Sequence, residues 1–190
     1  MRIIAGRFKK RKLITFKGQN IRPTPDALRE KIFNIIGYKI INANILDLFA
    51  GTGAMSLESI SRGAKFAVIV DNSSYAISII KTNIEKCNVL LQTRLIEWDV
   101  YKNLNCLKKY NFDLIFMDPP YQNSNIEKIF FNLFDSNCIN KNSLLILEHS
   151  NDINLLNIDN FKIIDQRKYG KSFASFFKLN DSHSKVKKEE

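Results

Sequence analysis

The chain has 190 residues, 45% of them hydrophobic, and carries a formal net charge of +10. This length is typical of one domain, and the apolar content excludes an intrinsically disordered chain. No apolar stretch approaches the roughly 20 residues of a membrane span, and no secretory leader is recognisable. Three separated cysteines without a CxxC pair argue against a disulfide framework or a zinc site. We therefore expect a metal-free, cytoplasmic monomer.

The positive charge is concentrated at the start of the chain. Residues 1–31 hold ten Lys or Arg and two acids, so +8 of the +10 lies there. A bias of the whole composition would spread the charge, whereas a localised basic arm suits phosphate contacts. Mitochondrial presequences are also basic, but their serine-rich composition is not matched here. We predict RNA binding by Arg7, Lys9, Lys10, Arg11, Lys12 and Arg22.

Two strand-like runs, 2–5 and 13–16, predict that this arm is a hairpin or extended. A helix should follow, with Thr24 as its N-cap, Pro25 at its first position and Gly37 at its end. Residues 1–42 are therefore interpreted as an arm and helix that contact RNA.

From residue 43 onward, short apolar runs alternate with helical patterns. The predicted strands are 45–49, 66–70, 94–98, 114–117 and 144–147, and the predicted helices lie around 54–62, 73–87, 100–109 and 124–137. Such alternation predicts a parallel sheet covered by helices. Two further strands, 161–165 and 173–179, are too close in sequence for a crossover helix, which predicts an antiparallel pair at the sheet edge.

These elements predict an α/β fold, with a mostly parallel seven-stranded sheet closed by a terminal antiparallel hairpin. That is the Rossmann-like arrangement of class I S-adenosylmethionine-dependent methyltransferases. The catalytic domain would span 43–180, and the polar tail 181–190 is expected to be disordered.

A glycine-containing loop, Asp47-Leu48-Phe49-Ala50-Gly51-Thr52-Gly53, follows the first of these strands. Ligands of doubly wound sheets bind at such strand ends. The glycines let the backbone pass close under a ligand, and a valine at 53 would fill that space. A dinucleotide fingerprint would need glycine where Ser56 stands, so it fits poorly. We assign Asp47 to the ammonium of an amino-acid moiety and place Phe49, Gly51 and Gly53 against the cofactor.

Two further acids follow the next strands. Asp71 lies 20 residues after Gly51, at a position where a carboxylate can accept hydrogen bonds from ribose hydroxyls. Asp99 follows the third strand and can accept from an adenine amino group, with Trp98 beside the ring. Together with the loop, these residues predict a site for S-adenosylmethionine.

The motif Asp118-Pro119-Pro120-Tyr121 follows the buried strand that ends at Met117. An exocyclic amine is a poor nucleophile, so it must be held in line with a reactive methyl while both of its N–H groups donate hydrogen bonds. The Asp118 carboxylate and the Pro119 carbonyl can accept those hydrogen bonds, the prolines stiffen the loop, and Tyr121 can stack on an extruded base. A proline-rich turn without function is the alternative. The position of the Asp-Pro-Pro-Tyr motif after a buried strand favours amine methylation, with all four residues catalytic.

Taken together, the sequence resembles the RsmD-type bacterial methyltransferases of guanine N2 in 16S ribosomal RNA. The resemblance is carried by Met1–Phe8, Arg11–Leu13, Arg22–Thr24 and Ile32–Asn34, then by Asp47–Gly53, Leu57–Glu58, Ser61–Ala64, Asp71 and Phe112–Tyr121. It implies S-adenosylmethionine at Asp47, Gly51, Gly53 and Asp71, and one guanine at Asp118–Tyr121, within an assembling small ribosomal subunit. Members vary between Asp and Asn where Asp99 stands.

Two other functions stay open. A DNA adenine-N6 or cytosine-N4 methyltransferase would use the same Asp-Pro-Pro-Tyr chemistry, but about 40 residues of arm leave little room for a target-recognition segment. A non-catalytic RNA-binding assembly protein is disfavoured because both the cofactor loop and Asp118 are intact.

Overall fold

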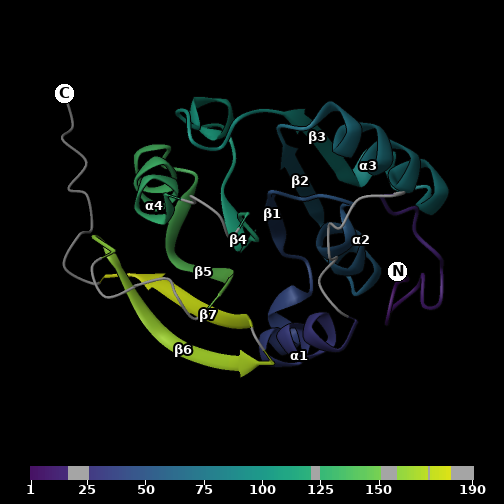
Figure 1. Ribbon diagram of the computed structural model, residues 1–190, viewed down its shortest axis with the longest axis horizontal. Helices are drawn as coiled ribbons and strands as arrows, with labels where there is room; N and C mark the ends of the chain where they lie inside the picture. Colours follow the sequence, from purple (N-terminus) through teal and green to yellow (C-terminus); the bar gives the residue numbers. More distant parts are fainter. Residues whose placement is uncertain (17–25, 121–124, 151–157, 171, 181–190) are drawn as a thin grey trace.

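The structure is a computed structural model, and it describes residues 1–16, 26–120, 125–150, 158–170 and 172–180. One seven-stranded sheet runs through it in the order β3-β2-β1-β4-β5-β7-β6 (Figure 1). The strands are β1 (Asn44–Leu48), β2 (Phe66–Asp71), β3 (Thr93–Glu97), β4 (Phe112–Met117), β5 (Ile139–Ser150), β6 (Phe161–Tyr169) and β7 (Ser172–Leu179).

The sheet has the predicted topology. The first five strands pair in parallel, and β7 then runs antiparallel between β5 and β6. The short connection from β6 to β7 leaves no length for a crossover, so the chain turns back on itself and forms a hairpin. The strand order reverses at β1 and β4, which places a topological switch point between these two strands.

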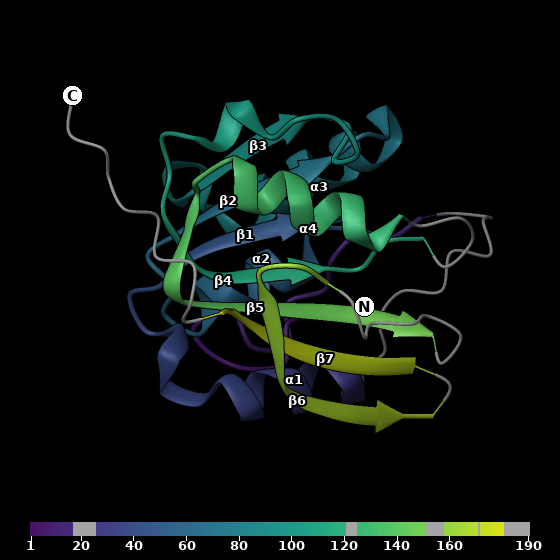
Figure 2. The ribbon, with the colours of Figure 1, turned by 90° about the vertical axis from the view of Figure 1, so that its left-hand side faces the viewer.

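Helices cover both faces of the sheet (Figures 1 and 2). They are α1 (Asp26–Ile36), α2 (Ala54–Ser61), α3 (Ser74–Cys87) and α4 (Ile126–Asp135). Successive strand residues point to opposite faces, so Ile45 packs with α1, α2 and α3, whereas Leu46 and Leu48 pack with α4. Two separate apolar cores follow from this alternation.

Several predicted elements differ from the observed ones. The predicted helix at 100–109 is wrong, because within this described stretch only a 3-10 turn, Asn105–Leu107, forms. Asp99 Oδ1 accepts from the Tyr101 amide at 3.0 Å and Asn103 Oδ1 from the Asn105 amide at 3.2 Å. Such side-chain bonds compete with the helical ladder. The fifth strand is also longer than the predicted 144–147.

The basic arm docks on the folded domain. An isolated antiparallel bridge joins Arg2 to Lys12, and the Ile3 amide donates to the Arg11 carbonyl at 2.9 Å. The predicted hairpin is thus present as one bridge rather than as two strands. Ile3 and Leu13 are buried in the core shared by α1, α2 and α3. The arm is consequently part of that core.

Helix α2 holds the arm by its backbone. Buried Glu58 accepts from the amides of Ile4 at 2.7 Å and Ala5 at 2.9 Å. The Ser61 carbonyl accepts from the Arg7 amide at 2.9 Å. A Cβ on Gly6 would lie 1.9 Å from that carbonyl oxygen, and Gly6 has φ +79°. Only glycine fits this close approach between arm and helix.

Helix α1 holds the arm by a buried cation. Arg29 is fully buried, and its Nη2 donates to the Arg2 carbonyl at 2.6 Å and to Asp26 Oδ1 at 2.8 Å. The helix ends before Gly37 as predicted. The predicted N-cap, Thr24, and Pro25 lie outside the described residues, as does the tail 181–190.

Candidate active site

Three loops leave the same rim of the sheet side by side. The last residue of β1, Leu48, pairs with Val70 of β2 on one side and with Met117 of β4 on the other. The chain therefore brings the glycine loop, Asp71 and Asp118 to adjacent positions at the carboxyl ends of three neighbouring strands. This rim lies at the switch point, where ligands of doubly wound sheets bind.

The glycine loop turns sharply between β1 and α2. Phe49, Gly51 and Gly53 all have positive φ, at 60°, 57° and 73°. A Cβ added at Gly53 would lie 3.3 Å from Ile80 Cγ2 of α3. A valine at 53 would therefore also press on α3, and its effect on the ligand space stays a prediction. At Gly51 an added Cβ would meet the Phe16 ring at 3.8 Å and no other described residue within 4 Å.

Asp47 is a buried carboxyl at the base of this loop. Its Oδ2 accepts from the Ser56 amide at 3.1 Å and from the Ser56 hydroxyl at 2.8 Å. Burial raises the pKa of Asp47 to about 7, against the lowering effect of the Ser56 hydrogen bonds. Among the described residues, Oδ1 has no hydrogen-bond donor. A cationic ligand beside Oδ1 would stabilise the ionised form, as the ammonium of an amino-acid moiety requires.

Asp71 connects two loops at the rim. Its Oδ2 accepts from the Gly51 amide at 2.8 Å, and its Oδ1 accepts from the Ser73 amide at 2.9 Å. Ser73 is in turn the N-cap of α3. The carboxylate thus fixes the glycine loop relative to α3, and each oxygen keeps a second lone pair for a ligand hydroxyl.

The third strand leads to Trp98 and Asp99. The Trp98 indole donates to the Asn103 carbonyl at 2.8 Å, and Asp99 Oδ1 accepts from the Tyr101 amide. The Phe49 and Tyr101 rings lie 5.7 Å apart. These contacts bring the loop after β3 against the glycine loop, so Asp99 lies on the same rim as Asp47 and Asp71.

The Asp-Pro-Pro motif follows β4 directly. Asp118 and Pro120 are exposed, and Pro119 between them is buried. The buried proline anchors the loop, while the carboxyl stays accessible from solvent. Tyr121 lies outside the described residues.

The predicted RNA-binding residues fall into two groups. The guanidinium of Arg7 donates to the Gln92 side chain, and Arg11 Nη1 donates to the Lys86 carbonyl at 2.7 Å. Both guanidinium groups also lie over the Phe8 ring, at 4.6 and 4.9 Å from its centroid. Lys9, Lys10 and Lys12 are exposed, as are Arg7 and Arg11. Arg22 lies outside the described residues.

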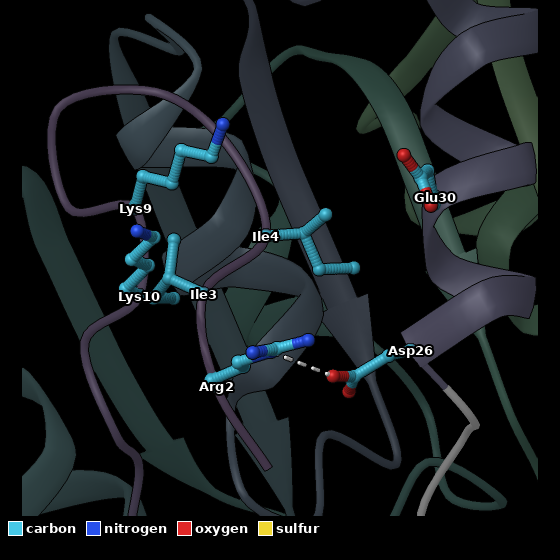
Figure 3. Close-up of a pocket in the computed structure, with 7 residues that line it drawn as sticks. All are labelled: Arg2, Ile3, Ile4, Lys9, Lys10, Asp26 and Glu30. Atoms are coloured by element: carbon cyan, nitrogen blue, oxygen red, sulfur yellow. Dashed lines mark hydrogen bonds and ion pairs between the residues drawn. The ribbon is translucent and has the colours of Figure 1, made fainter.

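A pocket lies between the arm and α1 (Figure 3). Arg2, Lys9 and Lys10 line it from the arm, and Asp26 and Glu30 line it from the helix. Arg2 Nε lies 3.3 Å from Asp26 Oδ2. None of the glycine-loop residues lines this pocket, so it belongs to the arm rather than to the rim.

Sequence reasoning missed two residues near the glycine loop. Phe16 of the arm packs edge-on against Tyr75, with ring centroids 5.6 Å apart, beside Gly51. Asn83 is fully buried on α3 and donates to the Thr52 carbonyl at 3.0 Å. A signal was available for Asn83, because it interrupts the otherwise apolar face formed by Ile80, Ile84 and Cys87.

Other kinds of site find no support in the described part of the chain. No group of three His, Cys, Asp or Glu side chains there could hold a metal ion. None of the described helices is both long and apolar enough to cross a membrane.

The strand order and the site at the switch point define a class I S-adenosylmethionine-dependent methyltransferase fold, as predicted. S-adenosylmethionine is the cofactor of that class. The chain belongs to the family described as Conserved hypothetical protein 95, whose sequence profile matches residues 1–178. The family resemblance predicted from the motifs is thereby confirmed.

Similar proteins support the assignment of the fold and of the family. Ribosomal RNA small subunit methyltransferase D of Buchnera aphidicola subsp. Acyrthosiphon pisum is 34% identical over 151 residues, covering 77% of this chain and 76% of its own. A hypothetical protein from Thermus thermophilus has a TM-score of 0.80 at 27% identity, over 94% and 99% of the two chains. A methyltransferase-like structure complexed with SAH has a TM-score of 0.62 at 16% identity, over 81% and 49%, which shows the fold alone.

Proposed function

We propose that this protein transfers a methyl group from S-adenosylmethionine to the exocyclic N2 of a guanine in small-subunit ribosomal RNA. One observation carries the proposal: Asp118-Pro119-Pro120 leaves β4 directly beside the loop that leaves β1, through the Leu48–Met117 pairing. A methyl donor held by the glycine loop and an amine held by Asp118 would then be neighbours.

On the cofactor side, each residue has a role that its contacts support. Asp47 would accept from the ammonium of the methionine moiety, which offsets the burial of its carboxylate. Gly51 and Gly53, with Phe49, would shape the loop under the cofactor. Asp71 would accept from the ribose hydroxyls, and Asp99 from the adenine amine.

On the substrate side, the residues act on the amine. When bound, S-adenosylmethionine supplies an electrophilic methyl group. Asp118 and the Pro119 carbonyl would each accept a hydrogen bond from one N–H of the amine, which orients the nitrogen lone pair toward that methyl. Pro120 would keep the loop rigid, and Tyr121 would stack on the base.

The basic arm supports an RNA substrate. We assign residues 1–42 to RNA contact and 43–180 to catalysis, with the exposed Lys9, Lys10 and Lys12 as phosphate contacts. Arg7 and Arg11 are held in place by Gln92 and Lys86, so they would bind phosphates at fixed positions. Arg22 would reach the target nucleotide. The ribosomal RNA named for the Buchnera relative agrees with this substrate.

One experiment tests the proposal. The protein is incubated with labelled S-adenosylmethionine and naked ribosomal RNA, small subunits from an unmodified strain, or DNA, and the modified nucleoside is identified. We expect N2-methylguanine from the small subunit. Methylated adenine or cytosine in DNA would establish the DNA methyltransferase instead, and cofactor binding without transfer to any substrate would establish a non-catalytic assembly protein.

A further inference from the structure

The end of the basic arm, residues 14–16, is held by one side chain of α3. The Ile14 amide donates to Asn83 Oδ1 at 2.8 Å, and Asn83 Nδ2 donates to the Ile14 carbonyl at 3.0 Å. The amide side chain thus pairs with both backbone groups of Ile14, as a neighbouring strand would. Nothing in the catalytic roles above uses this residue.

The same side chain also holds the glycine loop. The second N–H of Asn83 Nδ2 donates to the Thr52 carbonyl, between Gly51 and Gly53. Both N–H groups and the carbonyl oxygen are therefore engaged, and the residue is fully buried. A shift of the loop that moves Asn83 would therefore act on Ile14 as well, because one buried side chain is bonded to both.

Two further contacts join the arm to the same loop. The Thr52 hydroxyl lies 3.3 Å from the sulfur of Met1. The Phe16 ring stands 3.8 Å from where a Cβ of Gly51 would be. The arm therefore contacts the loop at both Gly51 and Thr52, although these partners are far apart in sequence.

We propose that Asn83 is a positioning residue that couples the basic arm to the cofactor loop. Cofactor binding would order the arm, and binding of phosphates by the arm would raise the affinity for the cofactor by the same factor, since such coupling is reciprocal. This inference rests on the proposed placement of the cofactor at the glycine loop. The partner of the arm is a polyanion, such as a stretch of RNA backbone.

The test uses two variants and a matched control. Asn83→Ala removes the whole link, and Ile14→Pro removes only the amide that donates to Asn83. Ser143→Ala is the control, because Ser143 is equally buried and its hydroxyl donates to the Phe112 carbonyl at 2.7 Å, near the opposite rim. S-adenosylhomocysteine is the probe, and the readouts are its calorimetric Kd and hydrogen exchange in peptides covering 1–16 and 50–57.

In the parent and the control, the probe should slow exchange in both peptides. In Asn83→Ala and Ile14→Pro it should slow exchange in 50–57 alone, and its Kd should rise about five-fold or more. A merely structural role would lower thermal stability in the same variants but leave the response of peptide 1–16 intact.

Three results would overturn the inference. Protection of 50–57 without 1–16 in the parent would refute the coupling and leave the cofactor site in place. If S-adenosylhomocysteine does not bind to the parent, both the coupling and the proposed cofactor site are refuted. If Asn83→Ala does not fold, Ile14→Pro decides, and a preserved response of 1–16 in that variant would show that the coupling does not depend on the bond from the Ile14 amide to Asn83.

Discussion

The substitution Gly6→Ala should detach the arm from α2. The new Cβ would lie 1.9 Å from the Ser61 carbonyl oxygen, so the arm or the helix must move. That movement breaks two hydrogen bonds, from the Arg7 amide to the Ser61 carbonyl and from the Phe8 amide to the Ser61 hydroxyl, each 2.9 Å long. Their loss costs about 2 kcal/mol, and the left-handed backbone adds about 1 kcal/mol for an alanine.

Gly37→Ala is the matched control. Gly37 also has positive φ, at 57°, but an added Cβ would meet nothing within 4 Å. It should therefore lower the free energy of unfolding by about 1 kcal/mol, and Gly6→Ala by about 3 kcal/mol. Urea denaturation measures both, and hydrogen exchange should show the amides of residues 4–8 losing protection in Gly6→Ala alone. Equal destabilisation by the two variants would refute the reasoning that Gly6 is required by close approach.

Three other predictions concern the site and the arm. Asp118→Ala should raise the barrier to methyl transfer by about 3 kcal/mol while the calorimetric affinity for S-adenosylmethionine changes by less than a few-fold, and near-normal turnover would contradict its role. Replacing Lys9, Lys10 and Lys12 by Gln should reduce the slope of log K for RNA binding against log salt concentration by about 0.7 to 0.9 per lost phosphate contact. An unchanged slope would show that these lysines do not contact phosphates. Because the pKa of Asp47 is raised to about 7, ionisation disfavours the folded state, so the parent should lose stability between about pH 4 and 8. Asp47→Asn should not show that loss in urea titrations, and parallel curves for the two proteins would count against the buried-carboxyl argument.

The sheet and the rim were predictable because their signals are local. Apolar runs such as 66–70 and 114–117 are typical of buried strands, and their alternation with helices allows few topologies. Parallel strands share one direction, so the loops after β1, β2 and β4 had to meet at one edge. The position of Asp47, Asp71 and Asp118 at that edge could be predicted for this reason.

The contacts that hold the arm were not predictable in this way. Glu58, Ser61 and Asn83 are polar residues on helices, and their partners lie 53 to 69 positions away in sequence. The full length of β5 was hidden for a related reason. Asn140–Asn142 look like a loop, but Ile139 pairs with Phe112 across a register shift and so extends the strand.

The long sequence separation of the arm contacts has a kinetic consequence. The bonds from Ala5 to Glu58 and from Arg11 to Lys86 close loops of 53 and 75 residues, whose closure entropy must be overcome before the contacts can form. During synthesis the arm therefore leaves the ribosome well before α2 and α3 exist to receive it, and it docks late. We therefore expect the arm contacts to be absent from the folding transition state, so that substitutions in the arm accelerate unfolding and leave the folding rate almost unchanged.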